Sequence, residues 1–538
     1  MAALSRRTRV HLLLLAFLPV APAAALAQPS GAPELRALWV DAFHAGIRSP
    51  EECAQLVADA RRIHANALIV QVRRRGDALY AGGVEPPLDD PGYQPSFDAL
   101  AHIVSAAHAA GIQVHAWMNA MPVWRDEAPP KDARHVFNLH GPAAPGDACW
   151  LTAARDGTKK FPVGYFLDPG HPAAQSHLVS VCLDIVRRYD VDGIHLDYIR
   201  YPETEGPAMP RGADVGYNPV SVARFQRATD RTDVPAPDDE AWIRWRRQQV
   251  TQLVRRISIE ARAIKPRVTV SAAAIAWGRP PASLADFQNA APMQRVFQNW
   301  QGWLAEGLLD LAVPMNYARE HDERVRNWFN GWIAWEKRHK AARHLAVGIG
   351  GYLSAPEGVL AQVSRVRAPD GRHRADGLSI FSYYQPSMAP PASPGAPAAA
   401  VQPGSTPPPQ APPPPTAAAD RLDYLVRGAG TSPAAFTGPA PVPPMPWIER
   451  PTHGFVAGTV AAEDGTAAEG RTIRIRRAGW FRKTRKTTSD ANGWFGMTRL
   501  SPGKYHVRLE DARGNALPER VEVIVAAGAV ARAAIIVK

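Results

Sequence analysis

One acidic residue, Asp197, stands at the end of a short apolar stretch and is the first candidate for chemistry in this chain of 538 residues. It closes the segment Gly193-Ile194-His195-Leu196-Asp197, whose alternation is typical of a buried parallel strand. In parallel α/β folds the C-terminal ends of the strands carry the chemistry. Asp197 could instead cap the next turn, because Asp is a common turn former.

The loop after Asp197 carries large side chains with polar tips, which suit stacking and hydrogen bonding with a polyhydroxylated ligand. They are Tyr198, Arg200 and Tyr201. Acid–base chemistry on such a ligand commonly uses two carboxyl groups, one protonated and one ionised. Candidates for the second carboxyl lie near other predicted strand ends, at Asp41, Asp77, Asp168 and Glu320.

A strand, a polar loop and an amphipathic helix alternate along the first two thirds of the chain. The predicted strands span residues 35–41, 67–72, 112–117, 193–197, 268–274, 309–314, 345–350 and 377–382. The main predicted helices span about 50–63, 97–110, 170–186, 239–264, 283–306, 322–340 and 356–367. Eight such units in series favour a closed (β/α)8 TIM barrel over an open sheet, in the α/β class.

A Pro- and Ala-rich run at residues 386–419 interrupts the barrel pattern where the last helix is expected. Such a run cannot pack a core. A short helical pattern follows at Leu422, Leu425 and Val426, and we interpret it as the delayed eighth helix. The barrel domain is therefore predicted over residues 28–447, with the proline run as an insertion within it.

Residues 452–538 consist of short alternating segments separated by turns such as Asn492-Gly493 and Pro502-Gly503. This pattern predicts a small all-β sandwich. Within it, Trp480 and Phe481 are surrounded by seven basic residues, which are Arg474, Arg476, Arg477, Arg482, Lys483, Arg485 and Lys486. This hairpin could hold an anionic polymer near the barrel, or it could be a solvated edge hairpin whose charges prevent aggregation.

The N-terminal 27 residues have the form of a signal peptide, with three early arginines, an apolar stretch and the small-residue site Ala25-Leu26-Ala27. We therefore expect export to the periplasm or the medium, with no integral membrane segment after cleavage. The formal net charge is +12, which is modest for this length, and nothing in the sequence suggests a nucleic-acid partner. The three cysteines allow at most one disulfide, and no metal or cofactor motif is present.

Several stretches of the barrel together resemble the glycosyl hydrolase-like family 10. They are Glu34 to Val40, Gln71-Val72-Arg73 with Gly76 to Tyr80, His115 to Asn119, Leu167 to Gly170, and the segment GIHLDYIRYP that contains Asp197. Relatives in this family include bacterial enzymes that cut peptide-free peptidoglycan glycan strands. Two positions depart from those enzymes, which tend to carry a second Asp at the place of Tyr198 and Pro-Gln-x-Tyr at Pro314 to Tyr317.

The resemblance implies a secreted glycoside hydrolase without a cofactor that acts on a cell-wall polysaccharide, with peptidoglycan glycan strands as the expected substrate. Because they lie in matching stretches, Asp168 and Asp77 rank first as partners of Asp197 in catalysis. The expected substrate-binding residues are Asp41, Arg73, Asn119, His195, Tyr198, Arg200, Tyr201, Asn316, Tyr317 and Tyr384. Three of the candidates have structural alternatives, since Asp168 could cap a helix, Asp77 could pair with one of the arginines at 73–75, and His195 could be a core histidine.

The C-terminal segment resembles the carboxypeptidase regulatory-like, transthyretin-type domain, through Gly458-x-Val460, Ser489 to Phe495 and Leu500 to Tyr505. In that family the domain is an accessory module. A second interpretation of the whole chain is therefore a non-catalytic, glycan-binding barrel with a docking module. A non-hydrolytic family member of this kind would retain the aromatic lining but lose one carboxylate.

Overall fold

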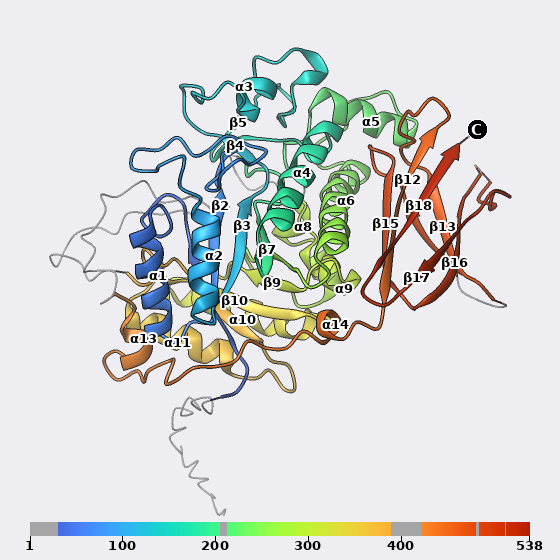
Figure 1. The fold of residues 1–538 in the computed structure, drawn as a ribbon. Coiled ribbons are helices and arrows are strands. Elements are labelled where there is room, and N and C mark those ends of the chain that lie inside the picture. Colours follow the sequence, from blue (N-terminus) through green and yellow to red (C-terminus); the bar gives the residue numbers. More distant parts are fainter. Residues whose placement is uncertain (1–30, 205–211, 389–420, 480–483, 512, 538) are drawn as a thin grey trace, which may run out of the picture.

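The computed structural model describes residues 31–204, 212–388, 421–479, 484–511 and 513–537 (Figure 1). The predicted signal peptide, most of the Pro- and Ala-rich run and the tip of the basic hairpin at Trp480 and Phe481 lie outside the described residues.

The described chain contains a closed barrel of eight parallel strands, in the order β1-β11-β10-β9-β8-β7-β3-β2. The strands are β1 (Leu35–Val40), β2 (Ala67–Arg73), β3 (Gln113–Asn119), β7 (Gly193–Asp197), β8 (Thr269–Ala274), β9 (Leu311–Pro314), β10 (His344–Gly350) and β11 (Gly377–Phe381). Nearly every strand residue is buried, as expected for strands covered on both faces. The predicted TIM barrel is confirmed.

The outer helices are α1 (Pro50–Arg62), α2 (Ala99–Ala109), α4 (Pro172–Arg188), α5 (Pro219–Thr229), α6 (Glu240–Ile264), α10 (Glu323–His339) and α11 (Pro356–Arg367). Capping side chains and prolines explain where several of these helices begin. In α1, the Ser49 side chain accepts a hydrogen bond from the Glu52 N–H and Pro50 occupies the first turn. Helix α5 was not predicted, although Asn218 caps it and Pro219 begins it in the same way.

The single helix predicted over residues 283–306 is wrong. The structure has three short helices there, α7 (Leu284–Phe287), α8 (Ala291–Gln294) and α9 (Trp300–Glu306). Pro292 lies in the first turn of α8 and cannot continue a preceding helix, and the Asn299 side chain caps α9 by accepting from the Gly302 N–H. The apolar spacing across the segment imitates one continuous helix.

The insertion after β3 contains a small antiparallel sheet in the order β4-β6-β5. Its elements are β4 (Pro122–Trp124), α3 (Val136–His140), the 3-10 turn η1 (Gly146–Ala148), β5 (Lys160–Phe161) and β6 (Gly164–Phe166). Because β4 follows β3 directly, this sheet lies over the C-terminal end of the barrel (Figure 1).

The segment predicted as the eighth helix forms a single helical turn, α13 (Tyr424–Arg427). Leu422 and Leu425 are fully buried in the barrel core, and Val426 packs against that core. Asp423 forms an ion pair with Arg62 at the end of α1. The chain then runs through α14 (Pro446–Glu449) to the C-terminal domain.

The C-terminal domain has two sheets, ordered β15-β12-β18 and β14-β13-β16-β17, which enclose a separate apolar core. The strands are β12 (Gly454–Ala462), β13 (Thr472–Arg477), β14 (Thr484–Thr488), β15 (Trp494–Leu500), β16 (Gly503–Leu509), β17 (Val521–Val525) and β18 (Val530–Val537). This is the predicted all-β domain. The polar strand β14 was not predicted, because it lacks an apolar alternation.

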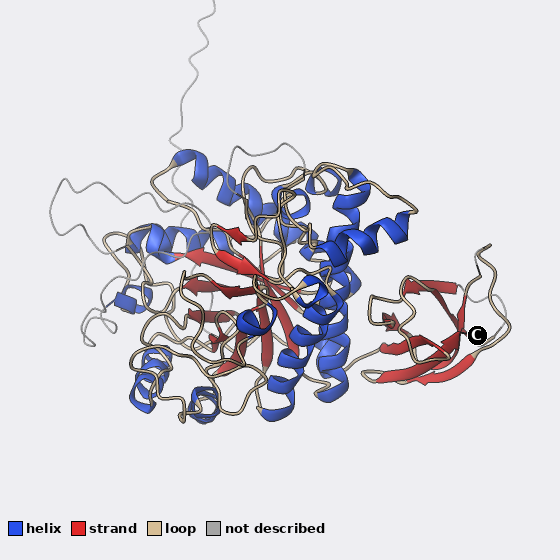
Figure 2. Ribbon diagram, turned by 90° about the horizontal axis from the view of Figure 1, so that it is seen from above, coloured by secondary structure: helices blue, strands red, loops and turns tan. Residues whose placement is uncertain are grey.

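The sandwich packs directly against helix α6 of the barrel (Figures 1 and 2). Trp494 forms a buried cluster with Ile259 and Ala457, and its ring N–H donates to Glu260 at 2.7 Å. Arg532 forms two hydrogen bonds, of 2.6 and 2.7 Å, to the same Glu260 carboxylate. The sandwich is therefore a fixed neighbour of the barrel, with buried apolar and charged contacts between them.

Cys53, Cys149 and Cys182 are buried and unpaired. Among the described residues, no helix has the length and apolar character needed to cross a bilayer.

Candidate active site

A cavity of about 650 Å³ opens at the C-terminal end of the barrel, and every barrel strand or the loop after it contributes to its wall. Its polar side chains include Gln71, Asn119, Asn316 and Ser382, and aromatic rings form much of the rest. The aromatic residues are Trp39, Phe43, Trp117, Tyr198, Trp277, Tyr317, Trp328, Phe329, Trp332, Tyr352, Phe381 and Tyr384. Flat rings with a few polar groups suit a sugar chain.

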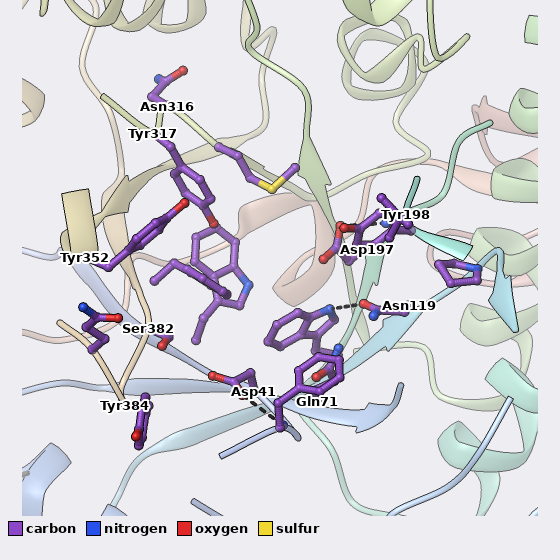
Figure 3. Close-up of a pocket in the computed structure, with 18 of the residues that line it drawn as sticks. Asp41, Gln71, Asn119, Asp197, Tyr198, Asn316, Tyr317, Tyr352, Ser382 and Tyr384 are labelled. Atoms are coloured by element: carbon purple, nitrogen blue, oxygen red, sulfur yellow. Dashed lines mark hydrogen bonds between the residues drawn. The ribbon is translucent and has the colours of Figure 1, made fainter. Parts of the chain in front are cut away.

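Asp197 ends β7 and lines this cavity (Figure 3). Its side chain is 6% exposed and accepts a hydrogen bond of 2.6 Å from the Tyr198 N–H. Burial raises the pKa of Asp197 to about 6, although the charge of Arg200 and the Tyr198 N–H act in the opposite direction. A carboxyl group with this pKa can hold a proton near neutral pH and donate it.

The chain turns sharply after Asp197, since Tyr198 has a left-handed backbone conformation with φ of +48°. This turn places the Tyr198 ring in the cavity wall beside Asp197 (Figure 3). The Arg200 guanidinium lies between two rings, 4.5 Å from the centre of Tyr198 and 5.0 Å from that of Trp277. Tyr198 and Arg200, both predicted to bind substrate, therefore lie in the cavity wall next to the candidate acid.

Asp41 also points into the cavity, from the end of β1 (Figure 3). It accepts hydrogen bonds from the N–H groups of Phe43 and His44 and lies 2.7 Å from the His44 ring nitrogen. The His44 ring stacks on Tyr384 at 3.8 Å between centres. Asp41 was predicted as a binding residue, and of the alternative carboxyls named from the sequence it is the one that lines the cavity with Asp197.

The other candidate carboxyls lie outside the cavity lining. Asp168 is fully buried and accepts from the Gly170 N–H at 2.6 Å and from the Ser221 hydroxyl at 2.9 Å, so it joins the turn before α4 to helix α5. Asp77 accepts from the N–H groups of Arg74 and Arg75. Glu320 forms an ion pair with Arg365. All three have structural partners, and none is brought together with Asp197.

Three of the predicted binding residues are also buried behind the cavity wall. Arg73 is fully buried in a two-bond ion pair with Glu85, at 2.6 and 2.7 Å. His195 lies between the Trp39 ring nitrogen at 3.2 Å and the Ser271 hydroxyl at 2.9 Å, and burial lowers its pKa to about 3. It is therefore a neutral core histidine. Tyr201 is fully buried as well.

Asn119, Asn316 and Tyr317 line the cavity as predicted (Figure 3). Asn119 accepts from the Trp117 ring N–H at 3.0 Å. The Asn316 amide donates at 2.8 Å to Glu336 of α10, a partner that no sequence signal identified. Burial raises the pKa of Glu336 to about 8, so this carboxyl is mainly neutral at pH 7.

Sequence reasoning missed several cavity residues that come from loops and from α10. Asp90, Asp126, Arg74, Arg75 and Arg125 line the cavity, as do three rings of α10 and the Tyr352 ring. The α10 rings have the helical spacing of a core face, so the sequence alone gave no reason to assign them to a cavity. Two of the cavity rings, Trp39 and Trp117, are only 2% and 4% exposed.

Residues 34–349 match the family described as Glycosyl hydrolase-like 10. The chain belongs to this family. Glycosyl hydrolase DigH of Escherichia coli strain K12 is 28% identical over 294 residues, which cover 52% of this chain and 62% of that protein. Glycosyl hydrolase YngK of Bacillus subtilis strain 168 is 25% identical over 303 residues, which cover 53% of this chain and 54% of that protein.

The chain thus spans less than two thirds of the length of these two relatives. Among solved structures, the glycoside hydrolase domain of PgaB (BpsB) from Bordetella bronchiseptica has 15% sequence identity and a TM-score of 0.46, covering 64% of this chain and 94% of that one. The family match covers seven of the eight barrel strands and supports a hydrolase that acts on glycans.

Proposed function

We propose that this protein is an exported glycoside hydrolase that cleaves a cell-wall polysaccharide, with peptidoglycan glycan strands as the first candidate substrate. The observation that carries the proposal is the position of Asp197, a buried carboxyl with a pKa of about 6 in an aromatic-lined cavity at the catalytic end of a TIM barrel. Family membership supports the same class of reaction. The signal-like N-terminus supports export.

In this mechanism, protonated Asp197 donates its proton to the glycosidic oxygen as the bond to the sugar breaks. A second, ionised carboxylate attacks the sugar or activates water. We assign this role to Asp41, because it directly follows strand β1 and lines the cavity, whereas Asp90 lies in a loop and is held by ion pairs with Arg48 and Arg74. The rings of Tyr317 and Tyr198 would position the sugar beside these groups.

A test of the function is incubation of the protein, processed at residue 27, with purified peptide-free glycan strands and a panel of neutral and acidic polysaccharides. We expect shortened oligosaccharides from the glycan strands, identified by mass spectrometry. An Asp41→Asn variant should lose most of this activity. If wild-type protein binds the strands but releases no product, the barrel is a glycan-binding module instead.

The outer face of the sandwich supports a second binding role, for an anionic cell-wall polymer. A shallow hollow there contains five basic residues, Arg474, Arg476, Arg477, His506 and Arg508. Glu510 pairs with Arg474 and Lys486, and Glu522 lies 3.1 Å from His506, so these two carboxylates neutralise only part of this charge. Attraction between exposed charges is screened over about 10 Å at 0.1 M salt.

We therefore expect the full chain to cosediment with anionic wall material at low ionic strength and to be released as the salt concentration rises. An Arg476→Glu/Arg508→Glu variant should sediment less, whereas hydrolysis of short oligosaccharides in the barrel should not change. Salt-independent sedimentation, or equal sedimentation of the variant, would assign the binding to the barrel.

A further inference from the structure

Three consecutive arginines lie at the end of β2 and directly after it, and two of them form ion pairs with other residues of the protein. Arg73 pairs with Glu85 in the core. Arg74 pairs with Asp77 and Asp90, at 3.1 and 2.6 Å. The third, Arg75, lines the cavity and forms no ion pair or side-chain hydrogen bond with any residue that the structure describes.

The environment of Arg75 disfavours an isolated positive charge. Its guanidinium lies 5.0 Å from the centre of the Phe43 ring, and the residue is partly buried. Burial lowers the pKa of Arg75, and the nearby charges of Arg74 and Arg125 lower it further. A bound anion would offset both effects.

Arg125 supplies a second guanidinium on the same cavity. It comes from the end of β4 in the insertion, is exposed, and likewise has no ion pair within the described chain. Asp77 and Asp126 are the acidic neighbours of Arg75, and their charges act on it more weakly than those of the two arginines do. The Asp126 carboxylate would compete with an anionic ligand for Arg75.

The charged side chains that line the cavity favour an anionic ligand when Asp197 is protonated. The arginines and aspartates of the cavity are equal in number, and they are Arg74, Arg75, Arg125, Arg200, Asp41, Asp90, Asp126 and Asp197. Protonation of Asp197, which the proposed acid role requires, leaves the cavity with one excess positive charge.

We propose that Arg75 and Arg125 form a subsite for a carboxylate carried by one sugar ring of the glycan. This inference rests on the proposed function and specifies its substrate class as an acidic, carboxylate-substituted glycan. The planar guanidinium fork fits a carboxylate with two parallel hydrogen bonds, and Phe43 provides a flat surface beside it. The carboxylate is either a lactyl ether substituent, as in a muramic acid unit, or the C6 carboxylate of a uronic acid.

The test measures binding in an Asp197→Asn background, which stops turnover and keeps the charge balance of the protonated acid. Calorimetry compares four oligosaccharides of equal length: muramic acid-containing strands, the same strands with the lactyl carboxylate reduced to an alcohol, neutral chitin oligomers, and oligouronates. Each is measured with Arg75 intact, with Arg75→Gln and with Arg75→Lys. Arg134→Gln is the matched control, because Arg134 is an exposed arginine of the same insertion that pairs with Asp132 and does not line the cavity.

Arg75→Gln should lower the affinity for the carboxylated ligand by roughly 10- to 100-fold, the range for a lost charge-assisted hydrogen bond. It should lower the affinity for the neutral ligands by less than about threefold. Arg75→Lys should give an intermediate loss of affinity, and Asp126→Asn should raise the affinity for the carboxylated ligand. The ligand that responds, muramic or uronic, identifies the source of the carboxylate. Thermal unfolding checks that each variant is folded.

If Arg75→Gln lowers the affinity for charged and neutral ligands equally, or for neither, the carboxylate subsite is wrong. The hydrolase proposal would remain intact. If the Asp197→Asn protein binds none of the four glycans and the wild type cleaves none, both proposals fail together.

Discussion

An Asp197→Asn variant is expected to lose glycan hydrolysis by about 10²- to 10⁴-fold, the usual contribution of a general acid. The substitution removes the transferable proton at the end of β7 but keeps nearly the same volume and can still accept from the Tyr198 N–H. Asp168→Asn is the matched control, since it replaces a second buried carboxyl whose pKa is also about 6 but which lies outside the cavity. Initial rates on peptide-free strands should separate the two variants clearly.

The same substitution should stabilise the fold near neutral pH. The pKa of Asp197 is raised from 3.8 to about 6, so the native state prefers the protonated form. Stability from this group is present below pH 3.8, falls as the pH rises to about 6, and is absent above that. At about 1.4 kcal/mol per pKa unit, Asn should raise the free energy of unfolding at pH 7 by on the order of 3 kcal/mol.

The dependence of kcat/KM on pH then tests which role Asp197 has. A general acid must be protonated, so activity should decline as the pH rises above about 6. If activity instead rises through pH 6 to a plateau, Asp197 acts as an ionised base or nucleophile. Unchanged activity in Asp197→Asn would remove it from the mechanism.

The barrel was predictable from the sequence because its strands are short apolar runs that each end in a polar loop. Asp197 could be identified for the same reason: it follows an uninterrupted buried strand, and the tight turn at Tyr198 comes directly after it. Positions at strand ends are fixed by local pattern. For this reason Asn119, Asn316 and Tyr317 were also placed in the cavity wall.

The choice of partner for each charged residue could not be predicted, since it depends on contacts between distant segments. The run Arg73, Arg74 and Arg75 gives no local sign that the first is buried and the last lines the cavity. Glu85, which decides the role of Arg73, lies 12 residues away in a loop. Asp168 shows the same limit, because its partner Ser221 comes from the unpredicted helix α5.

The ion pair of Arg73 with Glu85 leads to the second large expected effect. Arg73→Met should lower the free energy of unfolding by about 3–5 kcal/mol, because it leaves a fully buried carboxylate without its main partner. Burial alone would raise the pKa of Glu85, but Arg73 and His177 together lower it to about 2. Without Arg73 the Glu85 carboxyl should bind a proton more readily, so the loss of stability should shrink as the pH falls.

Arg73 also donates to the backbone oxygens of Asn119, Ala120 and Pro122, which fixes the loop between β3 and β4. The double variant Arg73→Met/Glu85→Leu should therefore recover stability, since no unpaired charge remains, but should not recover full activity. Chemical denaturation of both variants, with Arg75→Met as the control, measures these differences. A cavity-facing arginine contributes little to folding when the ligand is absent. If Arg73→Met lowers the free energy of unfolding no more than Arg75→Met does, the structural role of Arg73 is contradicted. Arg73 would then again be a candidate for substrate binding.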